Sequence, residues 1–142
     1  MTAKALARAR AEPVELDGDG GWIAAGDYER TGSPAEPWVA LLPGLDPTTM
    51  GWKRRDWYVD PSHTSRLFDG NGNAGPMIWA DGRIVGGWVQ RNDGTIAYQL
   101  LEDVGAEHRR AIEQAAHDLE MLLVPTRFSV RFPAPLQVEL RK

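Results

Sequence analysis

A chain of 142 residues, of which 42% are hydrophobic and 25% are charged, has the size and composition of one globular domain. The formal net charge of −4 excludes an overall electrostatic attraction to nucleic acid, although it allows a local basic surface. No apolar stretch approaches the length of a membrane span, and there is no cysteine to form a disulfide or a thiolate metal site. We therefore expect a cytoplasmic protein without a membrane partner.

Residues 1–12 are rich in alanine, lysine, arginine and leucine, which favour a helix that Pro13 would end. Isolated helices shorter than about 12–15 residues are barely stable in water. We interpret this segment as a linker helix, or as the remnant of a helix that packs on something upstream. Residues 13–142 are then expected to form a single β-rich domain.

The next segments predict short strands and loops. Residues 14–25 alternate between apolar and polar positions around the sequence DGDGG, which predicts a small hairpin. Residues 26–37 are polar and contain proline and glycine, as is typical of a surface loop. Residues 38–42 form an apolar run between two prolines, which indicates a buried strand. Residues 44–58 predict a turn and one irregular helical turn, and residues 60–75 predict a long polar loop.

The clearest local signal is an antiparallel hairpin at residues 77–90. Two β-prone runs flank the dipeptide Asp81-Gly82, which is typical of a two-residue type I′ turn. A third strand at residues 95–101 is expected to pair with the second strand of the hairpin. The tryptophans that fall in predicted strands are expected in the core: Trp38, Trp79 and Trp88.

Residues 106–123 place apolar side chains at helical spacing, which predicts one long amphipathic helix near the C-terminus. Its apolar stripe should comprise Ile112, Ala115, Ala116, Leu119, Leu122 and Leu123. A strand at residues 126–132 and a short helical turn at residues 135–142 are expected to follow. Because the strands precede the long helix, the predicted fold class is α+β, with a mostly antiparallel sheet or a partly closed β-barrel.

No catalytic constellation is recognisable in the sequence. The three histidines are too widely spaced to share a metal ion, and no serine or threonine lies in the context of a nucleophile. The pairs Asp46/Asp69 and Asp56/Asp60 have the chemistry for acid–base work, but turn and capping roles are commoner for such residues. The glycine-rich sequence GNGNAGP precedes a strand, whereas a phosphate-binding loop follows one. We therefore expect no metal and no cofactor.

Tryptophans and cations lie side by side in residues 52–57. Trp52 and Trp57 flank Lys53, Arg54 and Arg55. Such rings are able to stack on bases while the cations contact phosphates. The alternative is a solvated basic turn whose tryptophans anchor inward, and the sequence alone does not separate the two.

Two stretches, LLPGLDPTTMGWKRRDWY and GNAGPMIWADGRIVGGWVQ, carry a resemblance to a known family. The first stretch contains LLP (residues 41–43), then Leu45-Asp46, and then Trp52 and Arg55. The second contains a hydrophobic strand (residues 77–80), the Asp81-Gly82 turn, and a strand that ends in Gly-Gly-Trp (residues 83–88). From about Val14 onward, including LLEDVGAE and RFPAPLQVEL, the chain closely resembles the C-terminal β-rich domain of the winged-helix DNA-binding family that includes the AlkZ-like DNA glycosylases.

The resemblance implies a role in DNA repair. Glycosylase members of this family excise alkylated or crosslinked bases with a glutamine-containing motif in an upstream part, and no residue of this chain matches that motif. The resemblance therefore implies an accessory DNA-binding domain that is not catalytic by itself and that associates with the nucleoid in the cytoplasm.

The implied partners are double-stranded DNA, bound weakly, and a winged-helix domain or a second copy of the chain. The candidate DNA contacts, as phosphate ligands more than base readers, are Lys53, Arg54, Arg55, Arg83, Arg91, Trp52 and Trp57. The alternative function is a structural or interaction domain that packs on a winged-helix part or on a partner protein without touching DNA.

Overall fold

The chain divides into two compact units, residues 1–36 and 37–142, and the computed structural model describes residues 3–16, 18–27 and 36–142. In the first unit, helix α1 (Ala3–Arg8) is followed by an antiparallel hairpin of β1 (Ala11–Leu16) and β2 (Asp19–Ala24). The helix and the hairpin that the sequence predicts are confirmed. The loop predicted at residues 26–37 lies largely outside the described residues.

Strand β1 begins at Ala11, so it extends across the boundary that we placed between residues 12 and 13. The proposed division into a linker or remnant helix and a single β-rich domain stays a prediction.

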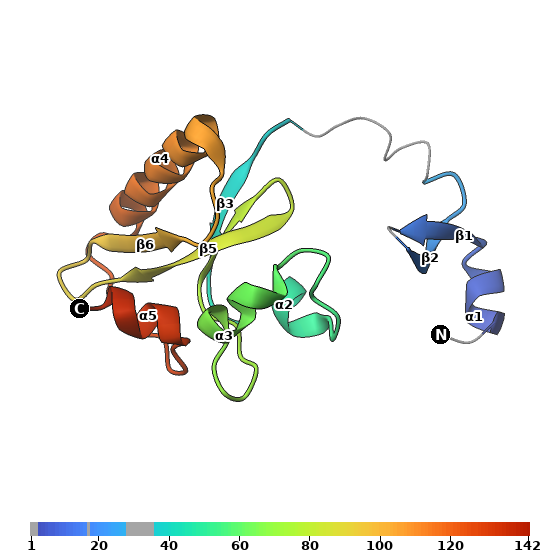
Figure 1. The fold of residues 1–142 in the computed structure, drawn as a ribbon, viewed down its shortest axis with the longest axis horizontal. Helices are drawn as coiled ribbons and strands as arrows, with labels where there is room; N and C mark the ends of the chain where they lie inside the picture. Colours follow the sequence, from blue (N-terminus) through green and yellow to red (C-terminus); the bar gives the residue numbers. More distant parts are fainter. Residues whose placement is uncertain (1–2, 17, 28–35) are drawn as a thin grey trace. The chain divides into compact units, whose positions relative to one another are not determined.

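The second unit is built on a four-stranded antiparallel sheet with the strand order β3-β4-β5-β6 (Figure 1). The strands are β3 (Val39–Leu42), β4 (Met77–Ala80), β5 (Arg83–Gln90) and β6 (Ile96–Leu100). Asp81 and Gly82 join β4 to β5 with φ angles of 47° and 83°, the left-handed conformation that a type I′ turn requires. The predicted hairpin and its third strand are therefore confirmed.

Helices cover both faces of this sheet. Helix α4 (Gly105–Leu123) packs on one face, and α3 (Thr64–Leu67) and α5 (Pro135–Leu140) lie on the other (Figure 1). Each face has its own core, with Ile112 of α4 in one and Leu136 of α5 in the other. Burial on both sides explains why β4 and most of β5 are continuous apolar runs instead of alternations.

The predicted partly closed barrel is wrong for the described part of the chain. The sheet is open, with β3 at one edge and β6 at the other. Because helices already cover both faces, the strands bury their apolar side chains without closing on themselves. The α+β class, the antiparallel sheet and the long amphipathic helix are confirmed, although α5 follows that helix.

The strand predicted at residues 126–132 does not form. The buried Gln90 amide instead donates from Nε2 to the Thr126 carbonyl (3.1 Å), and its Oε1 accepts the Phe128 N–H (3.1 Å). One side chain thus satisfies backbone groups that a neighbouring strand would otherwise pair. Residues 60–75 also differ from the predicted loop, because they contain a 3₁₀ turn, η1 (Pro61–His63), and α3.

Two of the predicted core side chains are exposed. Trp38 is 42% exposed because it precedes Val39, the first paired residue of the edge strand β3. Leu122 is 78% exposed, since at 100° per residue it lies roughly 80° from Ile112, at the margin of the apolar stripe. Trp79 and Trp88 are buried as predicted.

Glycines 86 and 87 of β5 allow its neighbours to approach closely. A Cβ atom on Gly86 would collide with the Gln99 carbonyl oxygen of β6, and one on Gly87 would lie 2.8 Å from Leu136 Cδ2 of α5. Next to them, Trp88 Nε1 donates to the Leu42 carbonyl of β3 at 2.9 Å. This part of the sequence, GGWV, is therefore dictated by packing on both sides of the strand.

Candidate nucleic-acid interface

Helix α2 (Pro47–Gly51) introduces the segment that carries most of the candidate contacts. Its N-terminus is capped as the sequence predicts, with Asp46 Oδ1 accepting the Thr48 N–H at 2.9 Å. The helix ends at Gly51, and Trp52 follows it with an extended backbone. We call residues 52–57 the basic loop. The loop is followed by Tyr58, whose carbonyl accepts the Ile84 N–H of β5 at 2.7 Å, and this bond ties the segment to the sheet.

The two tryptophans of the basic loop face solvent. Trp52 is 57% exposed and Trp57 is 61% exposed. Their rings meet edge to face, with centroids 6.1 Å apart and planes at 89°. Trp57 Nε1 donates to the Arg54 carbonyl at 3.2 Å, which holds this ring against its own loop. The alternative in which both tryptophans anchor inward is therefore wrong.

An aromatic series connects these rings to the core. Trp57 contacts Tyr58 edge to face at 4.7 Å, and Tyr58 stacks on Trp79 of β4 at 5.4 Å. Tyr58 is fully buried; its burial raises the pKa of its hydroxyl, which the Arg55 guanidinium partly offsets. Tyr58 was not among the site residues predicted from the sequence, although its position directly after Trp57 was an available signal. The series gives the exposed pair a rigid support.

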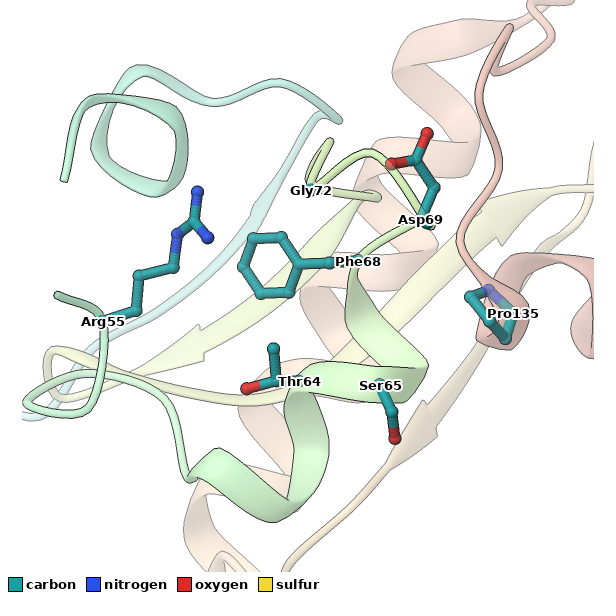
Figure 2. A pocket seen from close by; sticks show the side chains of 8 residues that line it. Arg55, Thr64, Ser65, Phe68, Asp69, Gly72 and Pro135 are labelled. Carbon is teal, nitrogen blue, oxygen red and sulfur yellow. The ribbon is translucent and has the colours of Figure 1, made fainter. Parts of the chain in front are cut away.

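The three cations of the basic loop have different environments. Arg55 Nε donates to the Thr49 carbonyl at 2.9 Å, and its guanidinium lies 4.5 Å from the centre of the Phe68 ring (Figure 2). Lys53 and Arg54 are exposed, and Arg54 lies 3.8 Å from the Asp56 carboxylate. Arg55 thus contributes to the fold, whereas the side chains of Lys53 and Arg54 are exposed, that of Arg54 beside the Asp56 carboxylate.

The other two predicted contacts, Arg83 and Arg91, lie at opposite ends of β5. Eight residues of strand place their Cα atoms roughly 26 Å apart. Arg83 lies next to the segment that follows the basic loop, and it pairs with Glu102 at 3.2 Å. Arg91 donates from Nε to the Leu140 carbonyl at 3.0 Å. The structure therefore brings Arg83 near the basic loop and leaves Arg91 apart from it.

The tip of the β4–β5 hairpin, beside Arg83, carries the acidic residue Asp81, which is held by contacts to other parts of the unit. The Asp81 carboxylate accepts the Trp38 N–H at 2.9 Å and lies 2.8 Å from His108 Nε2 of α4. The Trp38 N–H is the main reason that the pKa of Asp81 is lowered, and His108 adds to it. Asp81 therefore stays ionised and makes the tip itself a poor phosphate site.

A shallow concavity of about 520 Å³ lies beside Arg55 (Figure 2). It is lined by Arg55, Thr64, Ser65, Phe68, Asp69, Gly70, Gly72 and Pro135. This concavity was not predictable from the sequence, because it depends on α3, which lies where a loop was predicted. Its one acid, Asp69, accepts the N–H groups of Asn71 and Asn73 at 2.9 and 2.8 Å, and the Asn73 side-chain amide lowers its pKa most. With Arg55 engaged as well, both charged side chains of the concavity have structural partners.

The carboxylate pairs also have structural roles. Asp46 caps α2, Asp69 closes its own loop, and Asp60 accepts the Ser62 N–H at 2.8 Å to begin η1. The turn and capping roles expected for these three aspartates are confirmed. Within residues 3–16, 18–27 and 36–142, no three acidic or histidine side chains are grouped to hold a metal ion. None of the described helices combines the length and apolar character needed to cross a membrane.

A family model described as DNA glycosylase AlkZ-like matches residues 1–122. The chain belongs to the AlkZ-like DNA glycosylase family. This membership confirms the resemblance seen in the sequence. The fold is also similar to the DNA glycosylase AlkZ of Streptomyces sahachiroi, with a TM-score of 0.68 and 22% identity over 87% of this chain and 33% of AlkZ. The chain thus spans about a third of the length of AlkZ. No curated protein matches it.

Proposed function

We propose that this chain is an accessory DNA-binding module of the AlkZ-like family, without catalysis of its own, and that the basic loop is its contact surface. Family membership supports a function connected with DNA. The observation that carries the choice of surface is the exposed pair Trp52 and Trp57 around Lys53 and Arg54. The cytoplasmic, nucleoid-associated location belongs to the same proposal.

The charge balance of the loop sets the expected strength of binding. Lys53 and Arg54 are solvent-accessible cations, but Asp56 lies in the same loop and the whole chain carries a net charge of −4. Two phosphate contacts would contribute a slope of about −2 in a plot of log K against log salt concentration. We therefore expect weak duplex binding whose affinity falls only about tenfold between 50 and 200 mM salt. Arg83 would add a third phosphate contact only if its ion pair with Glu102 broke.

Fluorescence anisotropy of a labelled duplex at low salt tests this surface. The double variant Lys53→Ala/Arg54→Ala should bind about tenfold more weakly and with a shallower salt slope. Arg110→Ala/Arg141→Ala is the matched control, because it removes two exposed cations outside the loop and changes net charge equally. Equal losses in the two double variants, or no binding by the unmodified chain, would contradict the proposal.

A second candidate function, an interaction domain, is favoured by exposed apolar side chains near the end of α4 and beyond it. They are Met121, Leu122, Val124, Phe128 and Phe132. A surface of this kind would pack on another protein part or on a second copy of the chain. Light scattering over a concentration series tests self-association: Leu122→Lys should reduce it, and a monodisperse monomer at every concentration counts against pairing between copies.

A further inference from the structure

The rings of Trp52 and Trp57 offer more surface than phosphate contacts would use. In an edge-to-face pair, each ring keeps at least one face clear of its partner; Trp52 has no other described ring contact, whereas Trp57 also meets Tyr58 edge to face. More than half of each side chain is exposed. Flat apolar area is therefore open to solvent on the loop that also carries the exposed cations Lys53 and Arg54.

The structure also holds the Trp57 ring in position, and Trp52 packs against it. The Trp57 indole N–H is bonded to the Arg54 carbonyl, and its ring packs on Tyr58, which stacks on the buried Trp79. A ring that is fixed before its ligand arrives loses little conformational freedom on binding. The ligand chemistry that suits a fixed aromatic face beside cations is a flat π-system attached to a phosphate, as in a nucleotide of a nucleic-acid strand.

We propose that Trp52 and Trp57 form a stacking site for an unpaired nucleobase, with Lys53 and Arg54 contacting the adjoining phosphates. This inference rests on the DNA-binding function proposed above. Bases within an intact duplex have both faces covered by their neighbours, so only an unpaired base presents a face to the rings. The chain should therefore prefer DNA with single-stranded positions to fully paired DNA.

Anisotropy with three labelled DNAs of equal length tests the proposal: a thymidine strand, an abasic strand and a duplex. The abasic strand has the same phosphates without bases, so the thymidine strand should bind about 5- to 150-fold more tightly, as stacking of one base would give. Trp52→Ala should reduce this preference, and Trp52→Phe should retain part of it. We substitute Trp52 and not Trp57 because its one described ring contact is with Trp57, so the change should disturb the fold less.

Two controls separate the stacking site from the basic loop as a whole. Trp22→Ala removes an exposed tryptophan in the first unit and should leave the preference unchanged. Lys53→Ala/Arg54→Ala should weaken all three DNAs while the preference for bases persists. Equal binding of thymidine and abasic strands by the unmodified chain would overturn the stacking site and leave the DNA-binding function standing. Failure of all three DNAs to bind at low salt would overturn both.

Discussion

Gly86 provides a sharp test of how the sheet is packed. A Cβ atom at this position would overlap the Gln99 carbonyl oxygen, a backbone atom of the neighbouring strand. This oxygen cannot move aside as a flexible side chain would, because Gly86 pairs with Leu100 in the β5–β6 ladder. Gly86→Ala should therefore cost about 1–3 kcal/mol, the range of overpacked positions. For a unit of about 100 residues, each kcal/mol lowers Tm by about 4–8 °C.

Urea and thermal unfolding, followed by circular dichroism, measure this loss. Gly70→Ala is the matched control, because nothing lies within 4 Å of the added Cβ atom there. That substitution should leave stability unchanged or raise it by a few tenths of a kcal/mol. If Gly86→Ala were as stable as Gly70→Ala, the close approach of β5 and β6 would be refuted.

Three further predictions concern polar contacts of the second unit. Asp81→Ala should lower the free energy of unfolding in a urea titration, because the Trp38 N–H loses its acceptor. Asp81→Asn, which keeps an acceptor and tolerates positive φ, should cost less. Trp88→Phe should cost about 1–3 kcal/mol in urea unfolding, because it removes the donor to the Leu42 carbonyl. The folded-state pKa of Asp69 lies below the reference value of 3.8, so its stabilisation is present above that pH and is lost as pH falls through the folded pKa. Acid titrations should therefore show a smaller loss of stability below about pH 4 for Asp69→Asn than for the unmodified chain.

Elements with strong local signals were predictable from the sequence. The Asp81-Gly82 turn needs two residues with positive φ, and this dipeptide supplies them. The long helix follows from apolar spacing alone, and Ile112 and Ala116 are its buried positions. Capping by Asp46 was equally visible, since the bond joins residues only two apart.

The remaining features depend on contacts between distant residues. The choice between an open sheet and a barrel was decided by α3 and α5, which cover a face that the sequence pattern left unassigned. The strand expected at residues 126–132 was replaced by bonds from Gln90, more than 30 residues away. The orientation of the basic loop depends on the stacking of Tyr58 on Trp79, which local periodicity does not encode.

An NMR titration of the ¹⁵N-labelled chain with a short duplex carrying a single-stranded overhang tests the central claim most directly. The chain has six tryptophans, so the indole N–H signals report separately on the basic loop and on the core. We expect shifts for the indole signals of Trp52 and Trp57 and for the amides of residues 52–57, with α4 unchanged. Shifts confined to α4 and residues 121–132, with the two indole signals unmoved, would contradict it.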